Sequence, residues 1–142
     1  MKTLVVLPSY NENQNINNII DKILLQSPDN NVVVIDDNSP DNTIEIINKF
    51  IEKKKYKNRI HLIKRRDKLG RGSAVLEGLK WGYDNLHDLE LFIEMDCDFS
   101  HSPDEILKGK ELIKKYDFVI GARYPSGKIV NWPISQQLRL RM

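Results

Sequence analysis

The segment EMDCDFSHSP (94–103) brings carboxylates, a thiol and an imidazole close together in the sequence. It continues an apolar run typical of a strand, and residues i and i+2 of an extended chain point to the same side. Asp96 and Asp98 would then face one way and Cys97 the other. Two adjacent carboxylates repel each other unless a proton or cation lies between them, and a hard ion such as Mg²⁺, shared with phosphate oxygens, suits the pair. The alternative is the solvated end of a strand.

The thiol and the imidazole of this segment are weaker candidates for chemistry. Cys97 is the only cysteine of the chain, and no second cysteine or histidine stands at the spacing of a zinc site. A Cys–His nucleophile needs a thiol that faces the substrate, which the alternation of the strand argues against. We expect His101 to be a bystander and Glu94 to belong to the strand.

Two polar clusters follow earlier apolar runs, PSYNEN (8–13) and DDNSPDN (36–42). In the first, Tyr10 can stack on a nucleobase and Glu12 can accept hydrogen bonds from a base or sugar. The alternative is a turn that Tyr10 covers. In the second, a carboxylate at a strand end can bind a base or ribose, as in nucleotide-binding α/β folds. We interpret Asp37 as this ligand-facing carboxylate, with Asp41 as a structural cap and Asp36 left open.

Two arginines could meet a phosphate. The loop KLGRGS (68–73) can bring backbone N–H groups and Arg71 to an anion at the start of a helix, although a simple tight turn is equally consistent. Arg123, in the segment GARY, would place a guanidinium at a strand end beside the acidic pair, where a phosphate satisfies it.

The elements that position these residues alternate along the chain. Short apolar runs predict strands, and amphipathic segments between them predict helices. This order predicts an α/β fold with a mostly parallel central sheet flanked by helices, whose ligands bind beyond the carboxyl ends of the strands, where the polar clusters lie. The expected strands are 3–8, 31–37, 60–65, 90–96 and 117–124, and the expected helices are 13–26, 41–51, 72–86 and one that begins at Ser102 or Pro103.

Length and composition limit the function classes. A chain of 142 residues suits one domain, and a net charge of +2 excludes a strongly basic nucleic-acid-binding surface. A single cysteine favours a reducing compartment. No apolar run approaches the roughly 20 residues of a membrane-spanning helix, and the amino terminus lacks the features of a signal peptide. We therefore expect a cytoplasmic protein, or one bound peripherally to the cytosolic face of a membrane.

In their order, the segments VVLPSYNENQNI, VVVIDDNSPDNT, KLGRGSAVLEGLKWG, FIEMDCDFSHSPDEI, DFVIGARY and NWP resemble the family-2 inverting glycosyltransferases. Within that family the chain is most similar to the dolichol-phosphate (polyprenol-phosphate) mannosyltransferase branch. The resemblance implies a Rossmann-like nucleotide-sugar-binding domain of the glycosyltransferase A type over residues 1–142. Its nucleotide-sugar-binding region would be about 1–125, and its acceptor region would begin at about 126–142.

The resemblance also implies roles for single residues. Asp96 and Asp98 would bind Mg²⁺ or Mn²⁺ against the donor diphosphate, with Cys97 between them where the family usually has alanine. Arg123 would contact phosphate near the transfer site, and these two aspartates and the arginine are the catalytic candidates. The residues that would line the nucleotide pocket are Pro8, Tyr10, Glu12, Ile35 and Asp37. The implied nucleotide-sugar-binding set also includes Asp96, Cys97, Asp98 and Arg123.

The implied reaction is transfer of a hexose, with inversion, to a polyprenyl or dolichyl phosphate, with GDP-mannose as the expected donor. Because this acceptor is already an anion, no strong general base is needed. Beyond NWP the chain departs from the family, with Gln136 and Leu140 where the family typically has arginine and serine. Arg139 or Arg141 would substitute if the segment is shifted. The departure puts acceptor binding in question.

Three alternatives stay open from the sequence. Another donor, such as UDP-glucose, would use the same motifs. A non-catalytic fragment would bind the nucleotide sugar without transferring it. A phospho-acceptor signalling domain also gathers aspartates at strand ends, but it needs an acidic pair after the first strand, where this chain has PSYNEN.

Overall fold

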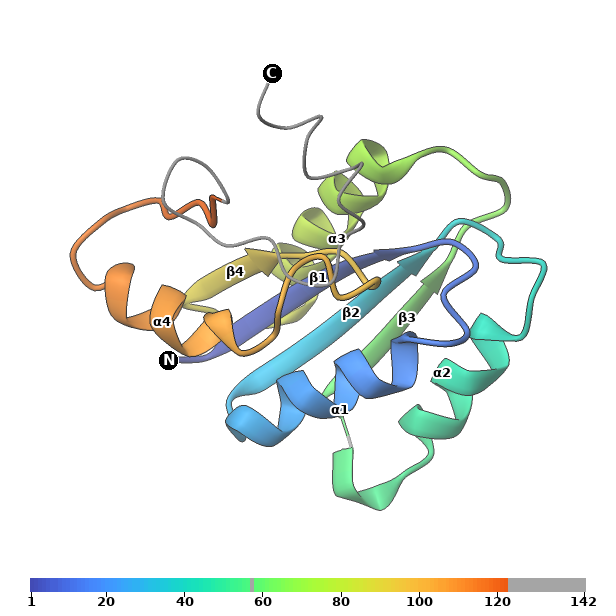
Figure 1. The fold of residues 1–142 in the computed structure, drawn as a ribbon, viewed down its shortest axis with the longest axis horizontal. Coiled ribbons are helices and arrows are strands. Elements are labelled where there is room, and N and C mark those ends of the chain that lie inside the picture. The colour runs from blue at the N-terminus through green and yellow to red at the C-terminus, as the bar shows by residue number, and fades with distance from the viewer. Residues whose placement is uncertain (57, 123–142) are drawn as a thin grey trace, which may run out of the picture. The chain divides into compact units, whose positions relative to one another are not determined.

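The structure is a computed structural model that describes residues 1–56 and 58–122. The chain divides into two compact units, Met1–Leu107 and Lys108–Met142. The first unit holds a parallel sheet in the order β3-β2-β1-β4 (Figure 1). The strands are β1 (Thr3–Ser9), β2 (Asn30–Asp36), β3 (Ile60–Lys64) and β4 (Leu91–Glu94), and the helices are α1 (Ile16–Gln26), α2 (Thr43–Ile51), the 3-10 turn η1 (Lys54–Tyr56), α3 (Arg71–Asn85) and α4 (Glu105–Leu112).

The two central strands are buried on both faces, as continuous apolar runs in a parallel sheet require. Alternate residues of β1 and β2 face opposite layers. Val5 and Val32, which are paired in register, belong to the core that α1 and α2 cover. Val6 and Val33 belong to the second core, under α3. Figure 1 shows α1 and α2 on one face of the sheet and α3 on the other.

The strand order explains why α3 changes face. The chain moves from β1 to β2 to β3 in one direction and then returns past β1 to β4. Because crossovers between parallel strands are right-handed, this reversal puts α3 on the opposite face from α1 and α2. The loop after β3 therefore runs to the opposite face from the loops after β1 and β2, and in open α/β sheets ligands bind beyond the carboxyl ends of the strands.

Two glycines bring α3 close to the sheet. A Cβ atom built on Gly78 would collide with the side chain of Val6, and one built on Gly82 would collide with that of Leu4. Gly70 precedes the helix with φ of 94°, a conformation that L side chains rarely adopt. The start of α3 is thus fixed near the carboxyl end of the sheet.

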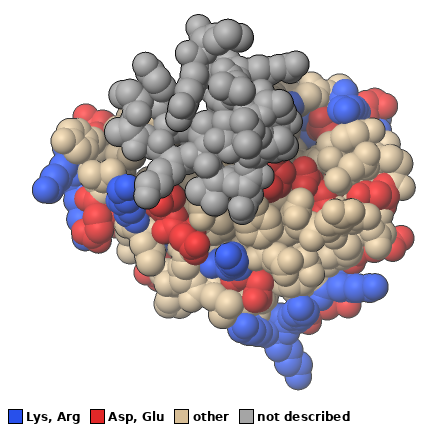
Figure 2. Space-filling view, viewed as in Figure 1, with Lys and Arg blue, Asp and Glu red and all other residues tan. Residues whose placement is uncertain are grey.

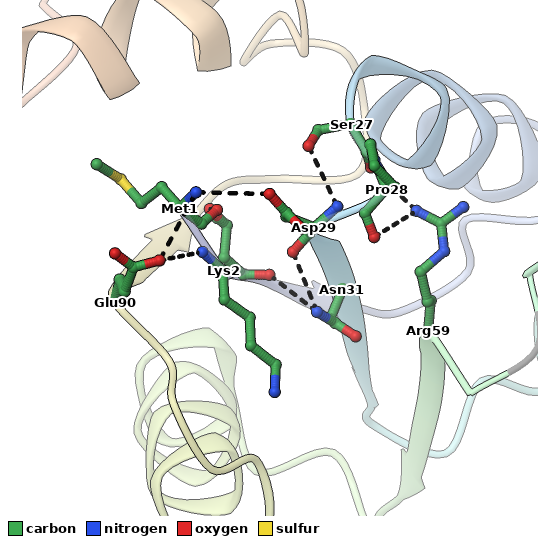
Figure 3. A network of polar contacts seen from close by, with 9 residues as sticks. Met1, Lys2, Ser27, Pro28, Asp29, Asn31, Arg59 and Glu90 are labelled. Carbon is green, nitrogen blue, oxygen red and sulfur yellow. Dashed lines mark hydrogen bonds and ion pairs between the residues drawn. The ribbon is translucent and has the colours of Figure 1, made fainter.

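The opposite edge of the sheet is closed by polar contacts between loops (Figure 3). The Arg59 guanidinium donates to the carbonyl of Ser27 at 3.0 Å, at the end of α1. The backbone N–H of Lys2 donates to the Glu90 carboxylate at 2.6 Å, which ties the start of β1 to the residue before β4. These contacts hold together the loops at the amino ends of the strands.

The lysine run that follows α2 lies at the same end as Arg59, before β3. Figure 2 shows basic side chains gathered at the lower edge of the molecule, where Figure 1 places the end of α2 and η1. The ammonium of Lys53 lies 3.6 Å from the ring centroid of Phe50, and that of Lys55 lies 4.8 Å from the ring centroid of Tyr56. The lysines thus pack on the aromatic residues of this end.

The first four expected strands and the four helices are confirmed, with shifts at their ends. Segment 117–124 was expected to be a fifth strand, and this expectation is wrong for 117–122, which form no strand. An extended run becomes a strand only where a neighbour pairs its N–H and C=O groups, and no ladder joins these residues to the described sheet. Residues 123 and 124 lie outside the described part. Within the described residues, no helix is long and apolar enough to cross a bilayer.

Candidate functional site

A pocket of about 270 Å³ lies at the carboxyl ends of the strands, among the loops that follow them. It includes most of the residues that the sequence indicated, among them Arg71 at the start of α3. The residues that line it are Pro8, Ser9, Tyr10, Glu12, Asp37, Lys68, Gly70, Arg71, Ala74, Asp96, Cys97 and Asp98.

A buried turn supports the loop after β1. Asp36 is fully buried, and its carboxylate accepts hydrogen bonds from the backbone N–H and the hydroxyl of Ser39, both at 2.7 Å. The hydroxyl oxygen of Ser39 in turn accepts the N–H of Asn11 at 2.9 Å, and Asn11 has φ of 59°. Asp36, which the sequence left open, is therefore a structural residue that fixes the loop carrying Tyr10 and Glu12.

Asp37 lines the pocket, but it is also half of a buried ion pair. One carboxylate oxygen accepts a hydrogen bond from the Arg65 guanidinium at 2.7 Å, and the other accepts one from the backbone N–H of Gly70 at 2.7 Å. The side chains of Asp37 and Arg65 are 6% and 5% exposed. Each carboxylate oxygen has a second lone pair, so Asp37 can still accept a hydrogen bond from a ligand.

Arg65 was missed by the sequence analysis. Its guanidinium also donates to the Ser73 hydroxyl at 2.7 Å and lies 3.2 Å from the Glu77 carboxylate. It thereby joins the end of β3 to the first turns of α3 and holds Asp37 in place. The available signal was a charged residue directly after an apolar strand, at the edge where the other polar clusters lie.

Tyr10 and Glu12 both line the pocket. The Lys68 ammonium lies 3.8 Å from the ring centroid of Tyr10, so the ring that we expected to stack on a base carries a cation in this structure. Burial raises the pKa of Glu12, the carboxylates of Asp98 and Asp96 raise it further, and a hydrogen bond from Asn15 opposes them. The pocket therefore holds an excess of negative charge that favours a cation.

Asp96 and Asp98 line the pocket together, while the thiol of Cys97 between them is buried. The thiol donates to the carbonyl of Pro8 at 3.3 Å, and burial raises its pKa well above the ordinary value. The expectation that Cys97 points away from its neighbours is confirmed. For Asp98, burial raises the pKa, but hydrogen bonds from Ser100 outweigh burial and the net shift is downward.

His101 and Ile35 differ from their expected roles. His101 is more than a bystander, because its Nδ1 accepts the backbone N–H of Asp96 at 3.0 Å and so positions the start of the acidic segment. Ile35 was expected to line the nucleotide pocket. It is instead fully buried under α3 beside Ala74, because the alternation of β2 turns it toward that helix.

Arg71, the first residue of α3, reaches across to the carboxylates that follow β4. Its Nε donates to Asp96 at 2.7 Å, and its Nη2 pairs with Glu94. The hydrogen bond to Asp96 is the main cause that raises the pKa of Arg71. Glu94 belongs to β4, as expected, and also anchors Arg71.

Among the described residues, the carboxylates of Asp96 and Asp98 are the most direct ligands for a metal ion in the pocket. No group of three or more Asp, Glu, His or Cys side chains in the described part of the chain is arranged to hold one. Mg²⁺ commonly binds one or two carboxylates and completes its shell with water and substrate phosphates. Asp96 and Asp98, which line the pocket together with the carboxyl group of Glu12, fit such an ion.

Several expected residues lie outside the described part of the chain. They are Arg123 and the region 126–142, which contains Gln136, Leu140 and the arginines on either side of Leu140, Arg139 and Arg141.

The profile of Glycosyl transferase family 2 matches residues 4–140. The chain belongs to this family. Three curated relatives are an undecaprenyl-phosphate mannosyltransferase of Micrococcus luteus (33% identical, covering 97% of this chain and 55% of the relative), a polyprenol monophosphomannose synthase of Mycolicibacterium smegmatis (34%, 93% and 49%) and a dolichol-phosphate mannosyltransferase of Pyrococcus furiosus (37%, 97% and 38%). The chain thus spans about half the length of these relatives, or less.

Solved structures confirm the fold. Residues 1–349 of TarS from S. aureus match with a TM-score of 0.63 at 24% identity, over 82% of this chain and 33% of that one. The mannosyltransferase PcManGT from Pyrobaculum calidifontis, in complex with GDP-Man and Mn²⁺, matches with a TM-score of 0.51 at 26% identity, over 56% of this chain and 24% of that one. The expected glycosyltransferase A type of fold is therefore the observed one.

Proposed function

We propose that this chain is the donor-binding part of a glycosyltransferase that moves a hexose from a nucleotide sugar to a polyprenyl phosphate. The observation that carries the proposal is the pocket itself. It joins Asp96 and Asp98, the nucleotide-binding candidates Tyr10 and Asp37, and the start of α3, all at the crevice where such folds bind nucleotides. The names of the three curated relatives support mannose as the sugar and a polyprenyl phosphate as the acceptor.

Within the pocket, Tyr10, Glu12 and Asp37 would bind the nucleoside. Tyr10 supplies a ring for stacking once Lys68 moves aside, and Asp37 is held rigidly by Arg65 and Gly70. A rigidly held acceptor gives specificity because only a base with a donor at the matching position can form the additional hydrogen bond. The backbone of Pro8, fixed by its bond from Cys97, would form the floor of the pocket.

Asp96 and Asp98 would hold Mg²⁺ or Mn²⁺ against the donor diphosphate. Bound there, the ion would act as a Lewis acid that stabilises the charge on the leaving diphosphate. The neighbour PcManGT, whose structure contains GDP-Man and Mn²⁺, supports this assignment. The N-terminus of α3, with Gly70 and Arg71 at the pocket, would add a site that favours an anion.

The proposed chemistry is a single displacement with inversion at the anomeric carbon. An oxygen of the acceptor phosphate forms the new bond to that carbon, and the bond to the diphosphate breaks, with its electron pair leaving on the nucleoside diphosphate. The acceptor is an anion, so no base is required to activate it. Arg123 would contact phosphate near this point. The polyprenyl acceptor implies peripheral contact with a membrane, which would place the protein on a cytosolic membrane face.

A second candidate is a nucleotide-sugar-binding protein without transfer. It is favoured by Gln136 and Leu140, which stand where the family has arginine and serine. Donor identity is a separate question, since UDP-glucose or another nucleotide sugar would use the same pocket.

Calorimetric titration of the chain with GDP-mannose and UDP-glucose, with and without Mn²⁺, tests these assignments. We expect metal-dependent binding of one donor that Asp98→Ala abolishes. The matched control is Asp104→Ala, which removes an exposed carboxylate outside the pocket. No metal-dependent binding of either donor would contradict the glycosyltransferase assignment. Binding without transfer to a polyprenyl phosphate, measured with a radiolabelled donor, would select the second candidate.

A further inference from the structure

Arg71 forms a hydrogen bond with Asp96, one of the two carboxylates that would bind the metal ion under the proposed function. Its Nε donates to Oδ1 of Asp96 at 2.7 Å, and its Nη2 pairs with Glu94, so the guanidinium bridges two carboxylates at the mouth of the pocket. The ion pairs are half open to solvent, with side-chain exposures of 50% for Arg71 and 32% for Asp96. Such pairs exchange partners at little cost.

The other cations near the pocket have different partners. The Arg65 guanidinium pairs with Asp37 and Glu77, and the Lys68 ammonium lies over Tyr10. Among the described residues that line the pocket, Arg71 is therefore the side chain that neutralises the acidic segment after β4. The Asp98 carboxylate instead accepts a hydrogen bond from the backbone N–H of Ser100 at 2.9 Å.

A divalent ion and Arg71 compete for Asp96. A metal that binds Oδ1 of Asp96 takes the oxygen that accepts the Arg71 hydrogen bond, and its charge repels the guanidinium. Resting on the proposed function, we propose that Arg71 is a built-in counter-cation that is exchanged for the metal when the donor binds. Released from Asp96, its guanidinium turns to the donor diphosphate, which binds a planar fork of donors well.

The exchange couples the two ligands. A metal alone must break the Arg71–Asp96 bond and leaves a cation beside a cation, so it binds weakly. A nucleoside diphosphate supplies a new partner for Arg71 at the start of α3, so it strengthens metal binding. The Arg71→Gln variant lacks the competing cation and the diphosphate contact, so it should bind metal alone more tightly and respond less to the nucleotide.

The test is Mn²⁺ binding to the full chain, followed by electron paramagnetic resonance of the free ion, with and without GDP. We expect Arg71→Gln to bind Mn²⁺ alone about threefold to tenfold more tightly than the unmodified chain. We expect GDP to enhance Mn²⁺ binding less in this variant. The matched control is Arg66→Gln, which removes the same charge from an exposed residue outside the pocket and should change the affinity less than about twofold.

Unchanged or weaker Mn²⁺ binding by Arg71→Gln would overturn the exchange. The expected result, tighter Mn²⁺ binding, is not one that misfolding of the variant produces. Arg71→Lys keeps the charge but not the fork, and should bind Mn²⁺ with intermediate affinity. Asp98→Asn separates the two proposals. If Asp98→Asn abolishes Mn²⁺ binding while Arg71→Gln leaves it unchanged, the metal site stands and the exchange fails. If Asp98→Asn binds Mn²⁺ like the unmodified chain, or the chain binds none, both fail.

Discussion

Replacing Arg65 by methionine should destabilise the fold and weaken donor binding together. Methionine keeps much of the side-chain length but leaves the Asp37 carboxylate, 6% exposed, with the N–H of Gly70 as its remaining described partner. Breaking a buried ion pair by removing one partner typically costs about 3 to 5 kcal/mol, because an uncompensated charge stays buried. Since both side chains are almost fully buried, no reduction for solvent screening applies.

Urea denaturation followed by circular dichroism measures this loss. We expect the free energy of unfolding of Arg65→Met to fall by about 3 to 5 kcal/mol, a large part of the total of about 5 to 15 kcal/mol for a typical domain. Arg66→Met, one residue along and exposed, should change it by less than about 0.5 kcal/mol. The double variant Arg65→Met, Asp37→Asn should recover part of the loss, because it no longer buries an unpaired charge.

A change for Arg65→Met as small as that for Arg66→Met would refute this reasoning. It would mean that Asp37 and Arg65 are not paired in a dry environment. The same variant tests function, because Asp37 would no longer be held in position. Affinity for the donor should fall even under conditions where the variant remains fully folded, as calorimetry at low temperature would show.

Two further predictions concern packing and the thiol. Gly78→Ala places a methyl group against Val6 and should lower the free energy of unfolding by about 1 to 3 kcal/mol. The control is Gly72→Ala, whose added Cβ contacts no other atom and which should leave the free energy of unfolding unchanged or raise it slightly. Equal effects of the two variants in urea denaturation would contradict the close approach of α3 to the sheet. Because burial raises the pKa of Cys97 well above 9.0, the unfolded chain loses this proton first as pH rises. The free energy of unfolding should therefore fall as pH rises above about 9, and this fall should be smaller in Cys97→Ala. In a separate test, a thiol reagent should label Cys97 far more slowly in the native chain than in the urea-unfolded chain.

The sequence predicted the fold well because its information is local and repeated. The apolar runs at 3–8 and 31–37 are too continuous for a half-exposed strand, and each helix shows its apolar spacing. The run at 117–124 has the same character but forms no strand in its described part. Its outcome depends on pairing with a neighbour, which a pattern within the run does not contain.

The site was predictable where alternation along a strand decides it. The burial of Met95 and Cys97, with Asp96 and Asp98 at the pocket, continues the alternation of the strand, although β4 itself ends at Glu94. Contacts between distant segments were not predictable in this way. The Arg65–Asp37 pair and the Arg71–Asp96 pair join residues that are 28 and 25 positions apart. Each depends on how α3 approaches the sheet, which Gly78 and Gly82 determine.

The central claim is that the carboxyl-edge pocket holds the metal and the nucleotide together. Nuclear magnetic resonance of the ¹⁵N-labelled chain with GDP tests it most directly, because bound Mn²⁺ broadens the signals of nearby amides. We predict that substoichiometric Mn²⁺ broadens the amides of Asp96, Asp98 and Glu12 first, and leaves those of Asn31 and Arg59 at the opposite edge sharp. Broadening centred on the opposite edge, or spread evenly over the acidic residues of the surface, would contradict the account.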